Sequence, residues 1–124
     1  MNNRKKGNAA EESAAKWIEK NKGYSIIDRN YKRRGGEIDI IALDGEVCAF
    51  IEVKYRKDTD CGYPSEAVTV RKQERIIKTA MKYMTEKGIE NPRFDVAEII
   101  ERDGKKYIRY TENAFEWRTV NDIK

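Results

Sequence analysis

The sequence predicts an α/β domain in which helices flank a mixed central sheet, with the elements in the order α-β-β-β-α-β-β. Three observations support this fold class. Residues 8–21 and 69–87 carry apolar side chains at helical spacing, whereas five other segments alternate between apolar and polar residues as strands do. Asp-Gly pairs at residues 44–45 and 103–104 are typical of tight hairpin turns. With 124 residues, the chain is expected to form a single domain over residues 1–124.

The first helix is expected over residues 8–21. Asn8 is a suitable N-cap, apolar side chains follow at Ala10, Ala14 and Ile18, and Gly23 is a suitable stop. Residues 1–7 are basic and polar, so we expect them to form a flexible arm. Residues 24–31 are rich in Ile and Tyr and have the composition of a first strand.

A β-hairpin is expected next, with strands near residues 36–43 and 46–56 after a basic turn at residues 32–36. A two-residue loop at residues 44–45 would place Glu37 opposite Glu52. Alternate strand residues face the same side, so four charged residues should share one face, with Asp39 about 7–8 Å diagonally from Glu52. These residues are Glu37, Asp39, Glu52 and Lys54. Their three carboxylates repel one another unless a cation lies between them.

The second half of the chain predicts a helix followed by another hairpin. Residues 57–66 have a loop composition, and Thr69 can cap a helix that runs to residue 87, just before Gly88. Its expected buried stripe is Val70, Ile76, Ile77, Ala80, Met81 and Met84. Strands are expected at residues 93–100 and 105–111, and residues 113–124 are expected to form a C-terminal tail with packed aromatic side chains.

The composition excludes several classes of protein and of site. The sequence has no histidine, so His-dependent zinc sites and Ser-His or Cys-His nucleophiles are excluded. No apolar run approaches the length of a membrane span, and the N-terminal segment lacks the apolar core of a signal peptide. Cys48 and Cys61 form no CxxC pair and are expected to be reduced thiols. Together these features predict a cytoplasmic protein that does not enter a membrane.

Charge is unevenly distributed along the chain. Residues 1–34 contain ten Lys or Arg and four Asp or Glu, and residues 71–87 contain six and two. Residues 35–66 instead contain three basic and eight acidic residues. An acidic centre between basic segments suits a polyanion held over a bound metal ion. The alternative is that Lys and Arg only keep the helix surfaces soluble, and charge alone favours this alternative.

The hairpin residues have the composition of a phosphodiesterase centre. Such hydrolysis needs an activated water and compensation of the charge that develops on phosphoryl oxygens, and Mg²⁺ held by one or two carboxylates supplies both. Asp39 and Glu52 are the candidate ligands, Lys54 can stabilise the developing charge, and Glu37 can join the metal shell or hold a water. The alternative is a surface hairpin with polar residues facing solvent. Against it, Glu52 interrupts an apolar run, where an unpaired charge is costly.

The motif around these residues resembles a known one. Glu37-Ile-Asp39 followed by Glu52-Val-Lys54 is similar to the bipartite motif of the PD-(D/E)XK nucleases. A wider set of residues, in this order, resembles the YraN-type family of predicted endonucleases, which are similar to archaeal Holliday-junction resolvases. The set is residues 28–30, 35–41, 50–56, Gly62, Pro64, 66–69, 71–73, 93–95 and 113–115. The resemblance extends from about Glu11 to Phe115.

The resemblance implies a restriction-endonuclease-like core with a metal-dependent endonuclease activity on DNA, including branched or damaged DNA. It implies Asp39 and Glu52 as ligands of Mg²⁺, for which Mn²⁺ would substitute, and Lys54 as the catalytic lysine. Glu11 matches a first-helix glutamate that completes the acidic cluster, and Glu12 would take that place if the helix were rotated by one residue. Ala10 departs from the family, which usually has glycine there.

Other residues are candidates for binding nucleic acid. Lys72 and Gln73 open the second helix, where a phosphate can bind. Arg33 and Arg34 lie beside two glycines that let a phosphate approach closely, and Arg56 follows the Glu-Val-Lys motif. A non-catalytic nucleic-acid-binding module remains the alternative function. Cutting both strands of a junction calls for two sites, so a homodimer is also expected.

Overall fold

The computed structural model describes residues 3–57 and 67–116 and confirms the predicted order of elements. Helix α1 (Asn3–Trp17) runs into a short π-helical turn, η1 (Ile18–Lys22). Strands β1 (Ser25–Arg33), β2 (Gly36–Asp44) and β3 (Val47–Lys57) follow. Helix α2 (Val70–Lys87), strand β4 (Pro92–Arg102) and strand β5 (Lys105–Phe115) complete the described part of the chain.

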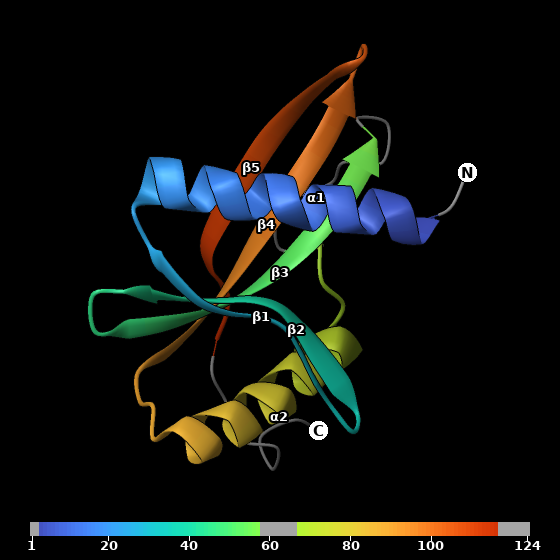
Figure 1. The fold of residues 1–124 in the computed structure, drawn as a ribbon. Coiled ribbons are helices and arrows are strands. Elements are labelled where there is room, and N and C mark those ends of the chain that lie inside the picture. The colour runs from blue at the N-terminus through green and yellow to red at the C-terminus, as the bar shows by residue number, and fades with distance from the viewer. Residues whose placement is uncertain (1–2, 58–66, 117–124) are drawn as a thin grey trace.

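The strands form one mixed sheet in the order β1-β2-β3-β4-β5. Only β3 and β4 are parallel, and α2 lies on the crossover that joins them; the other neighbours are antiparallel. Helices α1 and α2 lie on opposite sides of this sheet (Figure 1). The protein therefore has an α/β fold consistent with a restriction-endonuclease-like core, as predicted.

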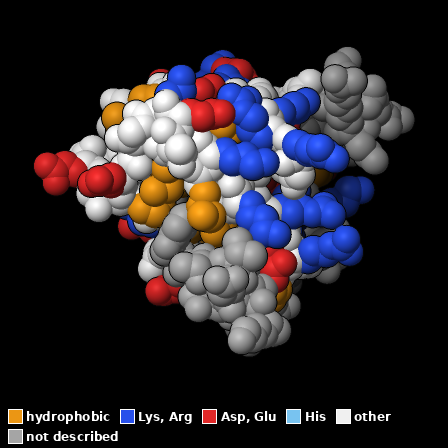
Figure 2. All heavy atoms as spheres, turned by 90° about the horizontal axis from the view of Figure 1, so that it is seen from below, with side chains coloured by type: hydrophobic (Ala, Val, Ile, Leu, Met, Phe, Trp, Pro, Cys, Tyr) orange, Lys and Arg blue, Asp and Glu red, His pale blue; other side chains and the backbone are white. Residues whose placement is uncertain are grey.

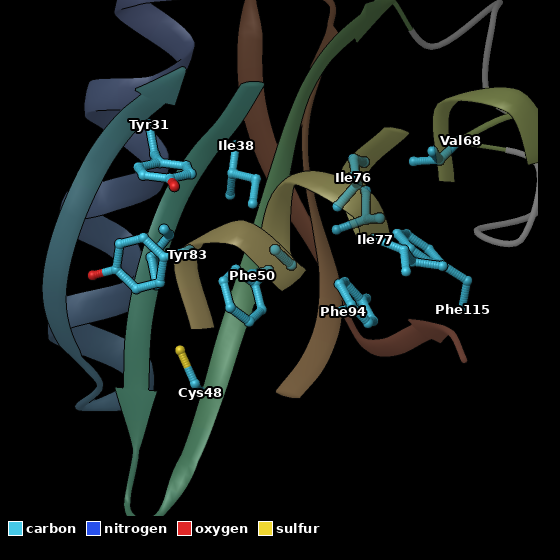
Figure 3. Close-up of a cluster of buried hydrophobic side chains, with 13 residues drawn as sticks. Tyr31, Ile38, Cys48, Phe50, Val68, Ile76, Ile77, Tyr83, Phe94 and Phe115 are labelled. Carbon is cyan, nitrogen blue, oxygen red and sulfur yellow. The ribbon is translucent and has the colours of Figure 1, made fainter. Parts of the chain in front are cut away.

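Each helix packs on the sheet through its own apolar cluster. Ala14 and Ile18 of α1 and η1 pack against Ile40 and Ile51 of the central strands. On the other face, Ile77 of α2 joins a larger cluster that contains three stacked phenylalanines (Figure 3). These are Phe50, Phe94 and Phe115, with ring centroids 5.7 Å and 5.1 Å apart along the stack. Both faces of the central strands are therefore buried, and a charged side chain on them needs a partner.

The first helix begins at Asn3 instead of Asn8, so residues 3–7 are helical instead of forming the flexible arm that the sequence predicts. Arg and Lys are good helix formers, and their preference outweighs the single Gly7 in this segment. The predicted stop is confirmed, because Gly23 caps η1 in the left-handed conformation with φ +70°.

The loop of the β2–β3 hairpin lies one residue later than predicted. Asp44 pairs with Val47, and Gly45 and Glu46 form the loop. Gly45 has φ +60° at the first loop position, which a type II′ hairpin turn favours for glycine. Asp44, predicted in the loop, is instead the last residue of β2, where it binds Arg93 at 2.7 Å. The expected placement of Glu37 opposite Glu52 is therefore wrong, because Ile40 pairs with Ile51 and the same register places Asp39 opposite Glu52.

Helix α2 has the predicted ends but a different buried stripe. The Thr69 hydroxyl accepts the backbone N–H of Lys72 at 3.2 Å, and Gly88 caps the other end with φ +66°. Val70 and Met81 are exposed, whereas Thr79 and Tyr83 are buried in their place. The helix turns this face toward the sheet because Tyr83 packs edge-on against Tyr31 and Phe50.

Strand β5 runs to Phe115, so residues 113–115 belong to the sheet and not to the predicted tail. The pairing with β4 shifts register between Phe94 and Val96. At this irregularity Asn113 has φ +52°, and its backbone N–H donates to Asp95 at 2.9 Å. Strand β5 continues past this bulge, and its last residue, Phe115, is buried. Trp117 lies outside the described residues.

Candidate active site

Asp39 and Glu52 lie where strands β2 and β3 separate. Their ladder ends at Ile40 and Ile51, and continuing that register by one step places Asp39 directly opposite Glu52. Beyond this point, the β1–β2 hairpin bends toward α2 while β3 continues beside β4 (Figure 1). The Asp39 carboxylate accepts the backbone N–H of Val53 at 2.8 Å. The acidic pair is therefore held by the fork in the sheet, and the predicted diagonal arrangement becomes a direct one.

Two ammonium groups approach the buried member of the pair. Glu52 is only 6% exposed, and its Oε2 lies 3.9 Å from Nζ of Lys54 and 3.4 Å from Nζ of Lys72. Lys54 follows Glu52 on the same face of β3, whereas Lys72 reaches it from the first turn of α2. The fold thus brings together the predicted Asp39, Glu52 and Lys54, and it adds Lys72 from a different element.

The pair is electrostatically unfavourable when both carboxylates are ionised. The pKa of Asp39 is raised to about 8, mainly by burial and next by the negative charge of Glu52. The hydrogen bond from Val53 acts in the opposite direction but is the weaker influence. At neutral pH the pair therefore retains a proton, unless a cation compensates its charge.

Glu11 projects from α1 toward the same site. Burial raises its pKa, and the charges of Glu37 and Glu52 add to that effect, so these groups lie within electrostatic range. Glu12 is exposed and forms an ion pair with Arg29 at 3.0 Å. Of the two candidates on the first helix, Glu11 is therefore the one that faces the acidic pair. Ala10, at the family's glycine position, is buried against the sheet.

Glu37 lies at the edge of the site, where it forms an exposed ion pair with Lys32 at 3.4 Å. It also lines a hollow of about 420 Å³ with Lys72 and Arg75. Within residues 3–57 and 67–116, no three His, Cys, Asp or Glu side chains converge closely enough to hold a metal ion by themselves. The oxygen donors that this region offers at closest range are thus the two carboxylates of Asp39 and Glu52.

Comparison with known proteins identifies the family. The model of the "Uncharacterised protein family UPF0102" matches residues 10–99. A UPF0102 protein of Alkaliphilus metalliredigens is 46% identical over 111 residues, covering 88% of this chain and 96% of the relative. One from Carboxydothermus hydrogenoformans is 40% identical over 119 residues, covering 94% and 100%. One from Geobacter sulfurreducens is 44% identical over 114 residues, covering 89% and 88%.

The chain belongs to the UPF0102 family. This is the YraN-type family of predicted endonucleases that the motifs indicated. The matched residues 10–99 include all residues of the site described above, from Glu11 of α1 to Lys72 and Arg75 of α2. In the described part of this UPF0102 protein, no helix is long and apolar enough to cross a bilayer.

Four of the five predicted nucleic-acid-binding residues of the UPF0102 chain have protein partners. Lys72 pairs with Glu52 of the site, and the other three contact other residues. Arg33 binds Glu86 through two nitrogens, at 3.1 Å and 3.0 Å, and stacks on Tyr31. Arg56 binds the buried Glu98 at 3.0 Å. The side-chain amide of Gln73 donates to a carbonyl of the loop before α2. These contacts hold the fold together. Arg34 and Lys72 are exposed, so they remain the better candidates.

Sequence reasoning overlooked Glu98 and the structural role of Gly36. Glu98 is completely buried in register with Lys54, and Arg56 and Arg109 bind it. It interrupts an apolar run in β4 as Glu52 does in β3, so the same signal marks both residues. Gly36 has no such signal, because its role depends on α2. A Cβ at Gly36 would lie 2.3 Å from Oγ1 of Thr79. The glycine therefore lets the β1–β2 turn pack against the helix.

Proposed function

We propose that this protein is a metal-dependent endonuclease that hydrolyses DNA phosphodiester bonds at Asp39, Glu52 and Lys54. The observation that carries the proposal is the buried carboxylate pair at the fork of β2 and β3, with two lysines beside it. A protein gains no stability from placing two acidic side chains together in this way. A carboxyl whose pKa is raised as strongly as that of Asp39 is typical of catalytic sites.

The donor set suits a hard divalent cation. Mg²⁺ prefers oxygen ligands, is commonly held by one or two carboxylates and keeps several of its waters. Asp39 and Glu52 would hold it, and Mn²⁺ would substitute because it accepts the same donors. Glu11, which faces the pair from α1, would bind the cation either through a water molecule or directly. A cation bound there would supply an activated water and compensate the charge of the phosphoryl oxygens.

The lysines would then act on the substrate. When a cation neutralises Glu52, Lys54 and Lys72 are released to bind oxygens of the scissile phosphodiester. Lys54 is the closer match to a catalytic lysine, because it projects from the same strand as Glu52 and is only partly exposed. Lys72 is more exposed, on the first turn of α2, and would position the phosphate. Glu37, at the rim of the site, would hold a water.

A second function has one observation in its favour. Lys54 and Lys72 already provide Glu52 with positive partners, so the pair can persist in a protein that binds nucleic acid without cutting it. A non-catalytic module would use the same surface and the same DNA. The two functions differ only in whether a divalent cation turns binding into hydrolysis.

The experiment is a cleavage assay on linear, nicked and branched DNA with Mg²⁺ or Mn²⁺. We expect metal-dependent cutting that falls by about 100-fold or more in Asp39→Asn, Glu52→Gln and Lys54→Ala. Glu46→Gln, in the exposed loop of the same hairpin, is the matched control and should cut like the wild type. Preference for branched DNA and a dimer that aligns two sites would connect the protein with junction processing.

Two results would contradict the enzyme. Binding without cutting on any of these substrates, with either metal, would favour the non-catalytic module. Cutting that survives both Asp39→Asn and Glu52→Gln would place the activity elsewhere or in a contaminating nuclease. Isothermal titration of Mg²⁺ into wild type and Glu52→Gln would test the cation site independently of activity.

A further inference from the structure

The outward face of α2 carries a row of cations, of which the proposed chemistry uses only Lys72. Lys72, Arg75, Lys78 and Lys82 follow one another at intervals of three and four residues, so they lie along one side of the helix. All four are exposed, as is Arg34 on the neighbouring β1–β2 turn. We call these five residues the α2 track. Figure 2 views this side of the molecule and shows Lys and Arg side chains gathered largely in one area.

The two acidic side chains of α2, Glu74 and Glu86, form no ion pair with the track within residues 3–57 and 67–116. Glu86 is engaged by Arg33 at 3.0 Å and by the Tyr31 hydroxyl at 2.5 Å. Among residues 3–57 and 67–116, no ion pair holds Arg75 or Lys78. Lys82 donates to the backbone carbonyl of Arg34 at 2.8 Å, which leaves its charge without a carboxylate partner. Like charges in a row repel one another, so an anion that covers the track would relieve this repulsion.

The track is concave because the β1–β2 turn packs against the middle of the helix. Gly36 allows this contact, since the position of its missing Cβ is taken by Thr79. The turn thereby separates two hollows of about 330 Å³ and 420 Å³, and Gly35 lines both. Arg34, Lys78 and Lys82 contribute to the first, and Lys72 and Arg75 to the second. Each hollow is thus lined by at least two cations.

The track also has a direction. Lys72 at one end lies 3.4 Å from Glu52, and Lys82 lies ten residues further, or about 15 Å along the helix axis. One strand of duplex DNA advances about 3.4 Å along the duplex axis per phosphate, and neighbouring phosphates lie further apart along the strand itself, so the track is long enough to contact more than one phosphate of a strand. A row of cations at this spacing suits a regular polyanion better than a single acidic group.

We propose that the α2 track binds the phosphodiester backbone of one strand of duplex DNA and leads it from Arg34 and Lys82 to the acidic pair. This inference rests on the proposed function for its partner, but it concerns binding and needs no metal. Because the cations contact only phosphates, binding should depend strongly on salt and little on base sequence.

The test measures binding of a fluorescein-labelled DNA duplex by anisotropy, in EDTA, using Glu52→Gln protein so that nothing is cut. Arg75→Glu/Lys78→Glu in this background should weaken binding at least tenfold at low salt. Across about 50–200 mM salt, it should reduce the slope of log K against log salt by about 2, one for each lost phosphate contact. Arg75→Gln/Lys78→Gln, which adds no negative charge, should show the same change in slope.

Lys16→Glu/Lys20→Glu is the matched control. It changes the net charge by the same amount at exposed positions of α1 and η1. We expect a small uniform loss of affinity and an unchanged slope. Equal effects of both double substitutions would overturn the track, because they would show that only net charge matters. If Glu52→Gln protein with an unmodified track does not bind the DNA duplex at low salt, the proposal is overturned as well.

The outcomes separate the track from the proposed chemistry. Selective loss of binding in the Arg75/Lys78 variants supports the track even if no DNA is ever cut. If the Arg75/Lys78 variants bind DNA and cut it with metal as the wild type does, the role proposed for the α2 track is contradicted. The proposed endonuclease activity is then still supported.

Discussion

At the residue scale, the surroundings of a carboxylate decide what it does. Glu46 and Glu52 belong to the same hairpin, but Glu46 lies exposed in the loop and Glu52 is buried beside Asp39. Beside Glu52, burial and the Glu52 charge raise the pKa of the Asp39 carboxyl, which favours binding of a proton or a cation at this position. The chemistry of the site thus comes from the sheet fork that forces Asp39 and Glu52 together.

The raised pKa of Asp39 predicts how stability depends on pH in metal-free buffer. Between about pH 4 and pH 8, the unfolded chain has released this proton while the folded protein retains it. The stability contributed by this group is therefore fully present below about pH 4 and is lost as pH rises through about 8. Asp39→Asn cannot ionise, so we expect it to match the wild type near pH 4 and to be more stable by at least about 1 kcal/mol above pH 8.

Chemical denaturation in EDTA at several pH values measures this difference, and adding Mg²⁺ should stabilise the wild type alone. Asn retains an oxygen that can accept the Val53 N–H, so the comparison isolates the charge. A loss of more than about 1 kcal/mol in Asp39→Asn at pH 8 would mean that the carboxylate is mainly structural.

At the scale of elements, the β1–β2 turn and α2 act as one unit. The turn carries Arg34 and leads into Glu37 and Asp39, whereas the helix carries Lys72. Their relative position is set where Gly36 packs against Thr79 and the backbone carbonyl of Arg75. This contact determines how far the acidic residues of β2 lie from the cations of the helix.

Gly36→Ala should therefore damage stability and cleavage together. Its Cβ would lie 2.3 Å from Oγ1 of Thr79 and 3.2 Å from the Arg75 carbonyl, so the turn must shift away from the helix. We expect a loss of about 1–3 kcal/mol in denaturation experiments, together with weaker cleavage.

A double-substitution cycle tests this explanation. Thr79→Ala removes the hydroxyl, which otherwise donates to the Arg75 carbonyl at 2.8 Å, and should cost little by itself. Combined with Gly36→Ala, it should recover part of the lost stability, because the closest steric conflict is gone. Purely additive losses would show that contact with Thr79 does not limit the position of the turn.

At the scale of the whole molecule, a buried ionic network joins the ends of the two hairpins. Asp95 of β4 is fully buried and accepts hydrogen bonds from Arg93 at 2.8 Å and from the Tyr110 hydroxyl at 2.6 Å. Arg93 also contacts Asp44 at the end of β2 and the Tyr24 hydroxyl just before β1. The network therefore holds together segments that are distant in the sequence, at the opposite end of the β2–β3 hairpin from the acidic pair.

Removing the buried charge should be far more costly than removing the exposed one. Asp95→Asn leaves Arg93 without its main partner, and we expect a loss of about 3–5 kcal/mol. Asp44→Asn breaks a contact to the same arginine at a position that is 41% exposed, and should cost less than about 1 kcal/mol. Urea denaturation of the two variants compares them directly. Similar losses would indicate that the network is not buried in solution.

Much of this fold follows from local patterns. Helix α2 begins after Thr69 and ends before Gly88 as predicted, because its cap and stop depend on neighbouring residues alone. The Asp103-Gly104 turn is also confirmed, since both residues adopt the positive φ that a type I′ turn requires. In the β2–β3 hairpin, Gly45 takes the first loop position. The pairing of the two strands changes by two residues as a result, so each side chain stays on its predicted face.

The sequence by itself determined the order of the elements, the family, and which carboxylates and lysine share one face of the hairpin. These features depend on periodicity, on turn residues and on motifs that are continuous in the chain. Only the tertiary structure brought Lys72 to Glu52, turned Glu11 instead of Glu12 toward the site and assigned Arg33 and Arg56 to structural ion pairs. The physical reason is that these contacts join elements separated by long stretches of chain, so they depend on how α1 and α2 pack on the sheet and on the fork that opens between β2 and β3.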